Sequence, residues 1–192
     1  MSKHELVYRF VASKIAYLNT LSNQNSNVYR ALLANMRRGV GHYPGELPEL
    51  WGIIFDRLPE ELYGQGKPSG AEWAIYSALT LYALHQQGSE DSVHCADITI
   101  GKAAAALVKS EDDTDRILKR LNLIATSVST EDLVYHLRGL IQLLKGESVK
   151  LDYARMAKEL YLFQYADAAN DIRIAWGRDF YRQINHLKEN KS

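Results

Sequence analysis

The chain carries basic side chains at spacings that suit contact with the phosphate groups of a polyanion. Arg116, Lys119 and Arg120 lie three and four residues apart, so on a helix they would share one face. Arg138 and Lys145 are seven residues apart, which also places them on one side of a helix. Such faces attract a polyanion by charge, without reading its sequence.

A second group of cations stands at the end of an expected helix. Arg37 and Arg38 precede a glycine turn and a Pro-Gly loop. Cations are favoured at this place by the partial negative charge of the last helical carbonyls. Gly39 and Gly41 are expected to supply the positive φ that closes the helix.

The same spacings also occur on ordinary solvated helices. An ion pair between Asp112 and Arg116 would account for one cation and would be worth only roughly a few tenths of a kcal/mol. Arg37 and Arg38 would then belong to a plain helix end and linker. The residues alone leave open both a basic binding surface and a solvated surface.

Lys102 follows a glycine, as does the lysine of a phosphate-binding loop. Ala96 stands where the first glycine of that loop would be, and Ala103 stands where its serine or threonine would be. The sequence therefore excludes a phosphate-binding loop at Gly101. Lys102 is expected instead to extend the patch around Arg138 from a neighbouring helix.

The sequence contains no convincing constellation of catalytic or metal-binding residues. His94 and Cys95 are adjacent, but no second Cys or His pair lies at zinc spacing. The acidic clusters at residues 111–113 and 131–132 stand at expected helix starts, where capping explains them. We therefore predict no catalytic residue, no metal site and no cofactor. A cysteine enzyme remains an alternative, in which Cys95 would react quickly with a thiol probe at neutral pH.

Composition limits how any polyanion would be bound. The 192 residues include 23 basic and 23 acidic ones, so the formal net charge is zero and only local clusters can attract nucleic acid. Hydrophobic residues make up 46%, which is typical of a folded protein. The single cysteine fits a reducing compartment, and neither a membrane span nor a secretory signal is evident. A cytoplasmic protein is expected.

Helical periodicity runs through almost every segment, so we predict an all-α protein. Ser69 and Glu72 form a capping-box pattern at the start of one long helix. Trp176, Phe180 and Ile184 lie at near-fourfold spacing and are expected in the core rather than on a base-stacking surface. The expected helices cover residues 4–21, 27–38, 50–58, 70–87, 99–109, a segment starting after 110, 130–146, 152–165 and 167–186.

The polar stretch GSEDSVHCAD divides the chain into two parts. We predict two packed helical bundles joined by a short linker, with an N-terminal bundle at residues 1–88, the linker at 89–98 and a C-terminal bundle at 99–192.

Two strings carry a resemblance to a known family. LLANMRRGVGHYPGELPELW (residues 32–51) and IRIAWGRDFYR (residues 172–182) resemble the CasB family, the small subunit of the type I-E CRISPR surveillance complex Cascade. The likeness spans nearly the whole chain. It implies an all-helical subunit without catalytic activity, two copies of which line the belly of the complex.

The resemblance also assigns residues. The RRG turn matches best, so Arg37 and Arg38 are the strongest candidates for phosphate contact. Arg178 and Arg182 are not among the candidates, because they could pair with acids such as Asp179 or Glu189. Similarity in TIGKAAAALV, RILKRL and VYHLRGLIQLL adds the remaining candidates for nucleic-acid binding, Lys102, Arg116, Lys119, Arg120 and Arg138.

The resemblance implies a function that the patches could serve. Basic helix faces would hold the guide RNA, the target strand and the displaced non-target DNA strand, stabilising the R-loop in antiviral defence. The implied partners are the other Cascade subunits, a second copy of this chain and these nucleic acids, with no membrane. The alternative is an all-helical protein–protein adaptor with no nucleic-acid role, whose binding would depend much less on salt.

Overall fold

The structure is a computed structural model that describes residues 1–189, apart from the side chains at positions 111, 187 and 188. Within this part the chain is all α-helical, as predicted, and contains two short 3₁₀ turns and one isolated β-bridge between His94 and Leu151. The elements are α1 (Lys3–Gln24), α2 (Ser26–Arg38), η1 (Pro48–Leu50), α3 (Trp51–Phe55), η2 (Glu60–Leu62), α4 (Gly70–Gln86), α5 (Ile100–Ala106), α6 (Glu111–Ala125), α7 (Thr130–Gly146), α8 (Tyr153–Leu162) and α9 (Ala166–Glu189).

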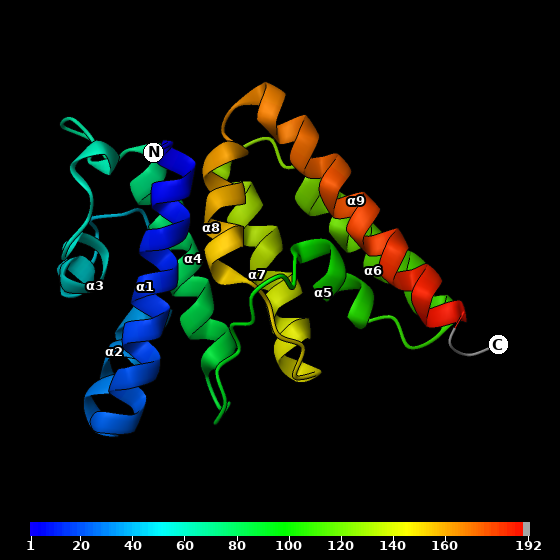
Figure 1. Ribbon diagram of the computed structural model, residues 1–192, viewed down its shortest axis with the longest axis horizontal. Helices are drawn as coiled ribbons and strands as arrows, with labels where there is room; N and C mark the ends of the chain where they lie inside the picture. Colours follow the sequence, from blue (N-terminus) through cyan, green and yellow to red (C-terminus); the bar gives the residue numbers. More distant parts are fainter. Residues whose placement is uncertain (190–192) are drawn as a thin grey trace.

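The helices form two groups, and the chain passes between them more than once (Figure 1). Helix α8 packs against α1 and α4, although it follows the predicted linker in sequence. Helix α5 packs against α9, and α7 contacts both α4 and α6. One hydrophobic core therefore runs across the boundary expected at residues 89–98. The division into 1–88 and 99–192 stays a prediction about folding units.

The expected linker is fixed to the connection between α7 and α8. The backbone N–H of Cys95 donates to Leu151 at 3.2 Å, and the N–H of Leu151 donates to Val93 at 3.0 Å. The N–H of Asp97 donates to a carboxylate oxygen of Asp152 at 3.1 Å. These bonds tie together two polar connections that lie far apart in sequence.

Helix α4 is the centre of the first group and is buried on nearly every side. Its start confirms the predicted capping box. The hydroxyl of Ser69 accepts the N–H of Glu72 at 3.0 Å, and the Glu72 carboxylate accepts the N–H of Ser69 at 2.6 Å. Because these bonds satisfy otherwise unpaired N–H groups, they fix where the long helix begins.

Two local predictions need correction. Gly39 has a φ of −73° and does not take the positive φ expected of it, whereas Gly41 does, at 85°. A Cβ on Gly39 would lie 2.7 Å from the Tyr76 hydroxyl, so this glycine allows the end of α2 to pack closely on α4. Helix α3 is also shorter than the expected 50–58, and Arg57 beyond it has a φ of 58°.

The core stripe expected in the last helix is confirmed at Trp176, Phe180 and Ile184, which are buried. Leu187 was expected in the same stripe, and its side chain lies outside the described residues. The indole N–H of Trp176 donates to the carboxylate of Glu159 at 2.7 Å, and Arg155 donates to the same carboxylate at 2.9 Å. Burial raises the pKa of Glu159, while Arg155 opposes that change. This polar pair anchors α9 on α8.

Acidification should destabilise the protein because of His85. Its ring is buried and shares a hydrogen bond of 2.9 Å with the Tyr153 hydroxyl, and burial lowers the pKa of His85 to about 4. As the pH falls below the ordinary histidine pKa, His85 becomes protonated in the unfolded chain but stays neutral in the folded chain. The free energy of unfolding should therefore fall by about 2 kcal/mol between pH 7 and pH 5.

Urea unfolding at several pH values measures this effect. His85→Gln keeps a polar side chain but cannot be protonated, so its stability should change much less with pH over that range. His94, whose pKa is also lowered by burial, accounts for a remaining slope. An unchanged pH dependence in His85→Gln would contradict the assignment.

Candidate nucleic-acid interface

Helix α6 carries its three predicted cations away from its buried side. Ile117 and Leu121 are buried, whereas Arg116 and Lys119 are exposed and Arg120 is half-buried. Arg116 pairs with Asp113 at 2.6 Å rather than with Asp112 as expected. The hydrogen bond from Arg116 lowers the pKa of the Asp113 carboxyl. One of the three cations is therefore partly compensated.

Helix α7 brings a fourth predicted cation to the same region. A Cβ on Gly139 would lie 2.8 Å from a guanidinium nitrogen of Arg120, so that side chain reaches α7 at Gly139, the residue that follows the exposed Arg138 in sequence. Arg116 of α6 and Gln142 of α7 line one pocket between the two helices. We call the surface formed by Arg116, Lys119, Arg120 and Arg138 the α6–α7 basic face.

Lys102 lies on α5, which packs mainly on α9 and also touches α7. Its ammonium group donates to the backbone oxygen of Asp97 at 2.9 Å. The Lys145 ammonium donates to Gln87 at 3.0 Å. The expected extension of the patch from Lys102 to Arg138 stays a prediction.

The two arginines at the end of α2 differ in their surroundings. Arg38 is exposed and pairs with Glu49 of η1 at 3.1 Å. Arg37 is half-buried and makes no ion pair or side-chain hydrogen bond with any residue that the structure describes. A cleft of about 470 Å³ is lined by the turn after these arginines and by Arg138, so this turn and Arg138 border the same cleft.

Helix α9 presents two cations that the sequence-based selection left out. Arg178 and Arg182 are exposed and form no ion pair within the described part of the chain. The acids expected to compensate them are engaged elsewhere. Asp179 accepts a hydrogen bond from the Thr99 hydroxyl at 2.7 Å, and Glu189 lies 3.6 Å from the His186 ring.

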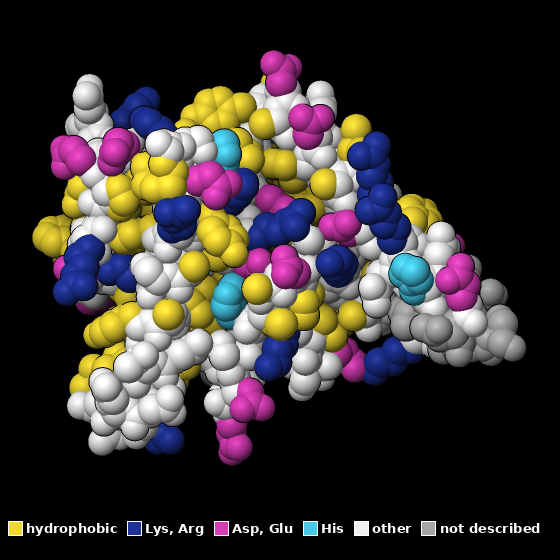
Figure 2. Space-filling model, in the orientation of Figure 1, with side chains coloured by type: hydrophobic (Ala, Val, Ile, Leu, Met, Phe, Trp, Pro, Cys, Tyr) yellow, Lys and Arg dark blue, Asp and Glu magenta, His cyan; other side chains and the backbone are white. Residues whose placement is uncertain are grey.

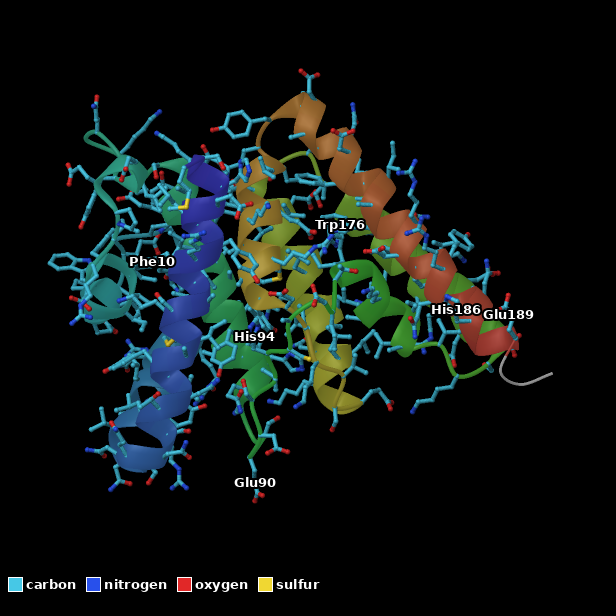
Figure 3. All side chains as sticks on the ribbon, in the orientation of Figure 1. Phe10, Glu90, His94, Trp176, His186 and Glu189 are labelled. Atoms are coloured by element: carbon cyan, nitrogen blue, oxygen red, sulfur yellow. The ribbon has the colours of Figure 1, made fainter. Side chains whose placement is uncertain are left out.

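These arginines belong to a mixed stripe along the outer side of α9. Tyr181, 50% exposed, lies between them in sequence, and basic side chains follow the helix in Figure 2. His186 and Glu189 mark its far end in Figure 3. The spacing of Arg178 and Arg182, opposite the buried Trp176 and Phe180, was the sequence signal for this stripe.

Features expected of enzymes are few in the described residues. No three His, Cys, Asp or Glu side chains there come together as a group that could hold a metal ion. Cys95 is half-buried and not in a disulfide. None of the helices over residues 1–189 has the length and apolar character needed to span a membrane.

Comparison with known families identifies the family of this chain. Residues 32–181 match the family model of the CRISPR-associated protein Cse2. The chain belongs to the Cse2 family. The match extends from α2 to α9 and includes every predicted site residue of this Cse2-family chain. No curated protein sequence matches it.

Solved structures resemble this Cse2-family chain over almost its full length. CasB from Thermobifida fusca is 29% identical, with a TM-score of 0.77 over 91% of this chain and 97% of that one. CasB from Thermus thermophilus is 22% identical, with a TM-score of 0.67 over 94% and 99% of the two chains. A chain from a CRISPR RNA-guided surveillance complex, 18% identical, gives 0.73 over 97% and 99%. The last two likenesses concern the fold.

Proposed function

We propose that this Cse2-family chain is the non-catalytic small subunit of a type I-E CRISPR Cascade complex. Its basic faces hold the guide RNA with its target strand and the displaced DNA strand, and so stabilise the R-loop in antiviral defence. The family match supports this proposal, as does the same fold in a solved CRISPR RNA-guided surveillance complex. The partners are the other Cascade subunits, a second copy of the chain, guide RNA and both DNA strands.

The observation that carries the proposal is a set of outward-facing cations without a carboxylate partner among the described residues. A chain of zero net charge can compensate its cations internally, and Lys14, Lys109 and Arg155 are examples that do form ion pairs. Cations without a carboxylate partner create a local positive potential, which attracts phosphate groups. When these cations bind the phosphates of a nucleic acid, the counterions condensed on the nucleic acid are released. At the end of α2, on the α6–α7 basic face and on α9, the cations without such a partner are Arg37, Lys119, Arg120, Arg138, Arg178 and Arg182. Exposed lysines elsewhere, such as Lys3, Lys67 and Lys150, also lack one in the described part of the chain.

The paired candidates fit the same role less strongly. Arg38 with Glu49 and Arg116 with Asp113 are pairs at the surface, where water screens the attraction, so a phosphate can replace the carboxylate. Base pairing with the guide RNA supplies the sequence selection, and this subunit supplies charge.

Salt dependence of binding tests the proposal. The purified chain should bind single-stranded and duplex DNA weakly and without sequence preference at low salt, and affinity should fall steeply as salt rises toward physiological concentration. Co-purification from the native host should recover small uniform RNAs with several larger subunits. A chain that binds only protein partners, with little salt dependence, would establish the adaptor alternative instead.

Removal of the two arginines at the end of α2 gives a first variant. Arg37→Ala with Arg38→Ala should leave the melting temperature nearly unchanged. Arg38 is exposed, Arg37 is half-buried without an ion pair to the described residues, and charges at a helix end contribute little to stability. The assembled complex should nevertheless retain target DNA less well, as a gel-shift titration would measure. A large drop in melting temperature would show that these side chains serve the fold, which would contradict their role in binding.

A further inference from the structure

The cleft beside Arg138 is built by two helices and one turn. Helix α4 forms its floor with Trp73 and Tyr76, and α7 forms one wall with Tyr135 and Arg138. Tyr43, in the turn after α2, stands on the opposite wall. The volume of about 470 Å³ lies within the range of sites that hold small organic groups, which begins at about 300 Å³.

Four aromatic side chains line this cleft, and they differ in exposure. Tyr135 is 72% exposed and Tyr43 is 46% exposed, whereas Trp73 and Tyr76 are buried below them. Exposed ring faces above a pre-formed hollow are the arrangement on which single-stranded nucleic acids stack their bases. Stacking tolerates any base, because each base has a π face.

One buried polar group in the lining of the cleft lacks a hydrogen bond to the described residues. The Tyr76 hydroxyl is buried and, among the described residues, has no hydrogen-bond partner. It lies beneath Gly39, at the turn that forms the second wall. Burial, with a smaller effect of Glu46 and Glu49, raises the pKa of this hydroxyl to about 12, so it stays protonated. A buried hydroxyl without a partner costs free energy.

We propose that this cleft accepts one unstacked base of a nucleic-acid strand whose phosphate is bound by Arg138. The inference rests on the proposed function, since it requires a strand on the α6–α7 basic face. Tyr135 lies three residues before Arg138 on α7, which places their Cβ atoms about 5–6 Å apart. One nucleotide can therefore place its phosphate at the arginine and its base against the tyrosine ring.

The charges of the cleft lie at different places in its lining. Glu46 bonds to the ring nitrogen of His42 at 2.6 Å, and Glu131 accepts a hydrogen bond from Thr130 at 3.1 Å. Arg138, which has no ion pair with the described residues, supplies the positive charge on the α7 side. The two carboxylates would repel a phosphate, so the phosphate belongs at Arg138 and the uncharged base faces the rest of the lining.

Two oligonucleotides with the same phosphates test the inference. The full chain is titrated at low salt with oligothymidine and with an oligonucleotide of equal length in which abasic sites replace the bases. The wild type should bind oligothymidine about tenfold more tightly, as expected for stacking of one base. Tyr135→Ala should reduce this ratio several-fold, whereas Arg138→Ala should weaken both oligonucleotides. Tyr17→Ala, which removes a tyrosine of 52% exposure elsewhere, should leave the ratio unchanged.

The possible failures are distinguishable. Equal binding of both oligonucleotides by the wild type, or an unchanged ratio in Tyr135→Ala, would overturn the base site and leave the proposed function standing. Binding of neither oligonucleotide would overturn both. An arginine-rich peptide whose binding is lost in Tyr135→Ala, while the two oligonucleotides bind equally, would assign the cleft to a protein partner and overturn the inference.

Discussion

Gly101→Ala should destabilise the protein by about 3 kcal/mol or more, a large effect for one methyl group. A Cβ at this position of α5 would collide with the carbonyl oxygen of Trp176 and lie 3.0 Å from the backbone nitrogen of Phe180. Backbone atoms cannot rotate away as a side chain can. Helix α5 would have to separate from α9, which would loosen buried residues such as Ala104.

Urea unfolding followed by circular dichroism measures the loss. Gly177→Ala is the matched control on α9, because a Cβ there meets nothing within 4 Å. That variant should be neutral or stabilised by up to about 1 kcal/mol, since alanine favours a helix over glycine. Similar midpoints for Gly101→Ala and Gly177→Ala would contradict close packing of α5 on α9 as the reason for Gly101.

Gly101 also shows why sequence patterns reveal local structure better than packing. Next to Lys102, this glycine invited comparison with a phosphate-binding loop, and local spacing was enough to exclude that motif. Its role depends on Trp176 and Phe180 of α9, which lie more than 70 residues later in the chain. No local pattern reports such an approach between distant segments.

The elements that were predicted well are those governed by neighbours in sequence. Ser69 with Glu72 and Ser129 with Asp132 form the expected caps, and helical periodicity located the main helices. The return of α8 onto α1 and α4 was not foreseen, because an amphipathic stripe predicts that a helix is covered without identifying which helix covers it.

The candidate site follows the same division. Spacing placed Arg116, Lys119 and Arg120 on one side of α6, which the structure bears out as an outward-facing set. Whether a cation is compensated depends on tertiary contacts. Arg38 meets Glu49 across a loop, while the acid nearest to Arg178 in sequence is engaged with Thr99. Proximity in sequence therefore did not predict correctly which arginines lack a carboxylate partner and can bind phosphate.

Neutralising three cations of the α6–α7 basic face should produce the largest functional loss. The combined variant Lys119→Gln, Arg120→Gln and Arg138→Gln should bind single-stranded DNA on the order of a hundredfold more weakly at low salt, if each phosphate contact contributes about 1 kcal/mol. The slope of log affinity against log salt should shrink by about two, because fewer counterions are released. Stability should change little, since Lys119 and Arg138 are exposed.

A matched control separates this local surface from net charge. Lys3, Lys67 and Lys150 are exposed and lie outside the α6–α7 basic face, so changing all three to glutamine alters net charge by the same amount. Long-range attraction depends on net charge and is screened within about 10 Å at 0.1 M salt, whereas bound phosphates require cations in contact. The control should therefore lose only a few-fold in affinity and keep nearly the wild-type salt slope. Equal losses in both variants would mean that binding is diffuse, and the α6–α7 basic face would then have no special role.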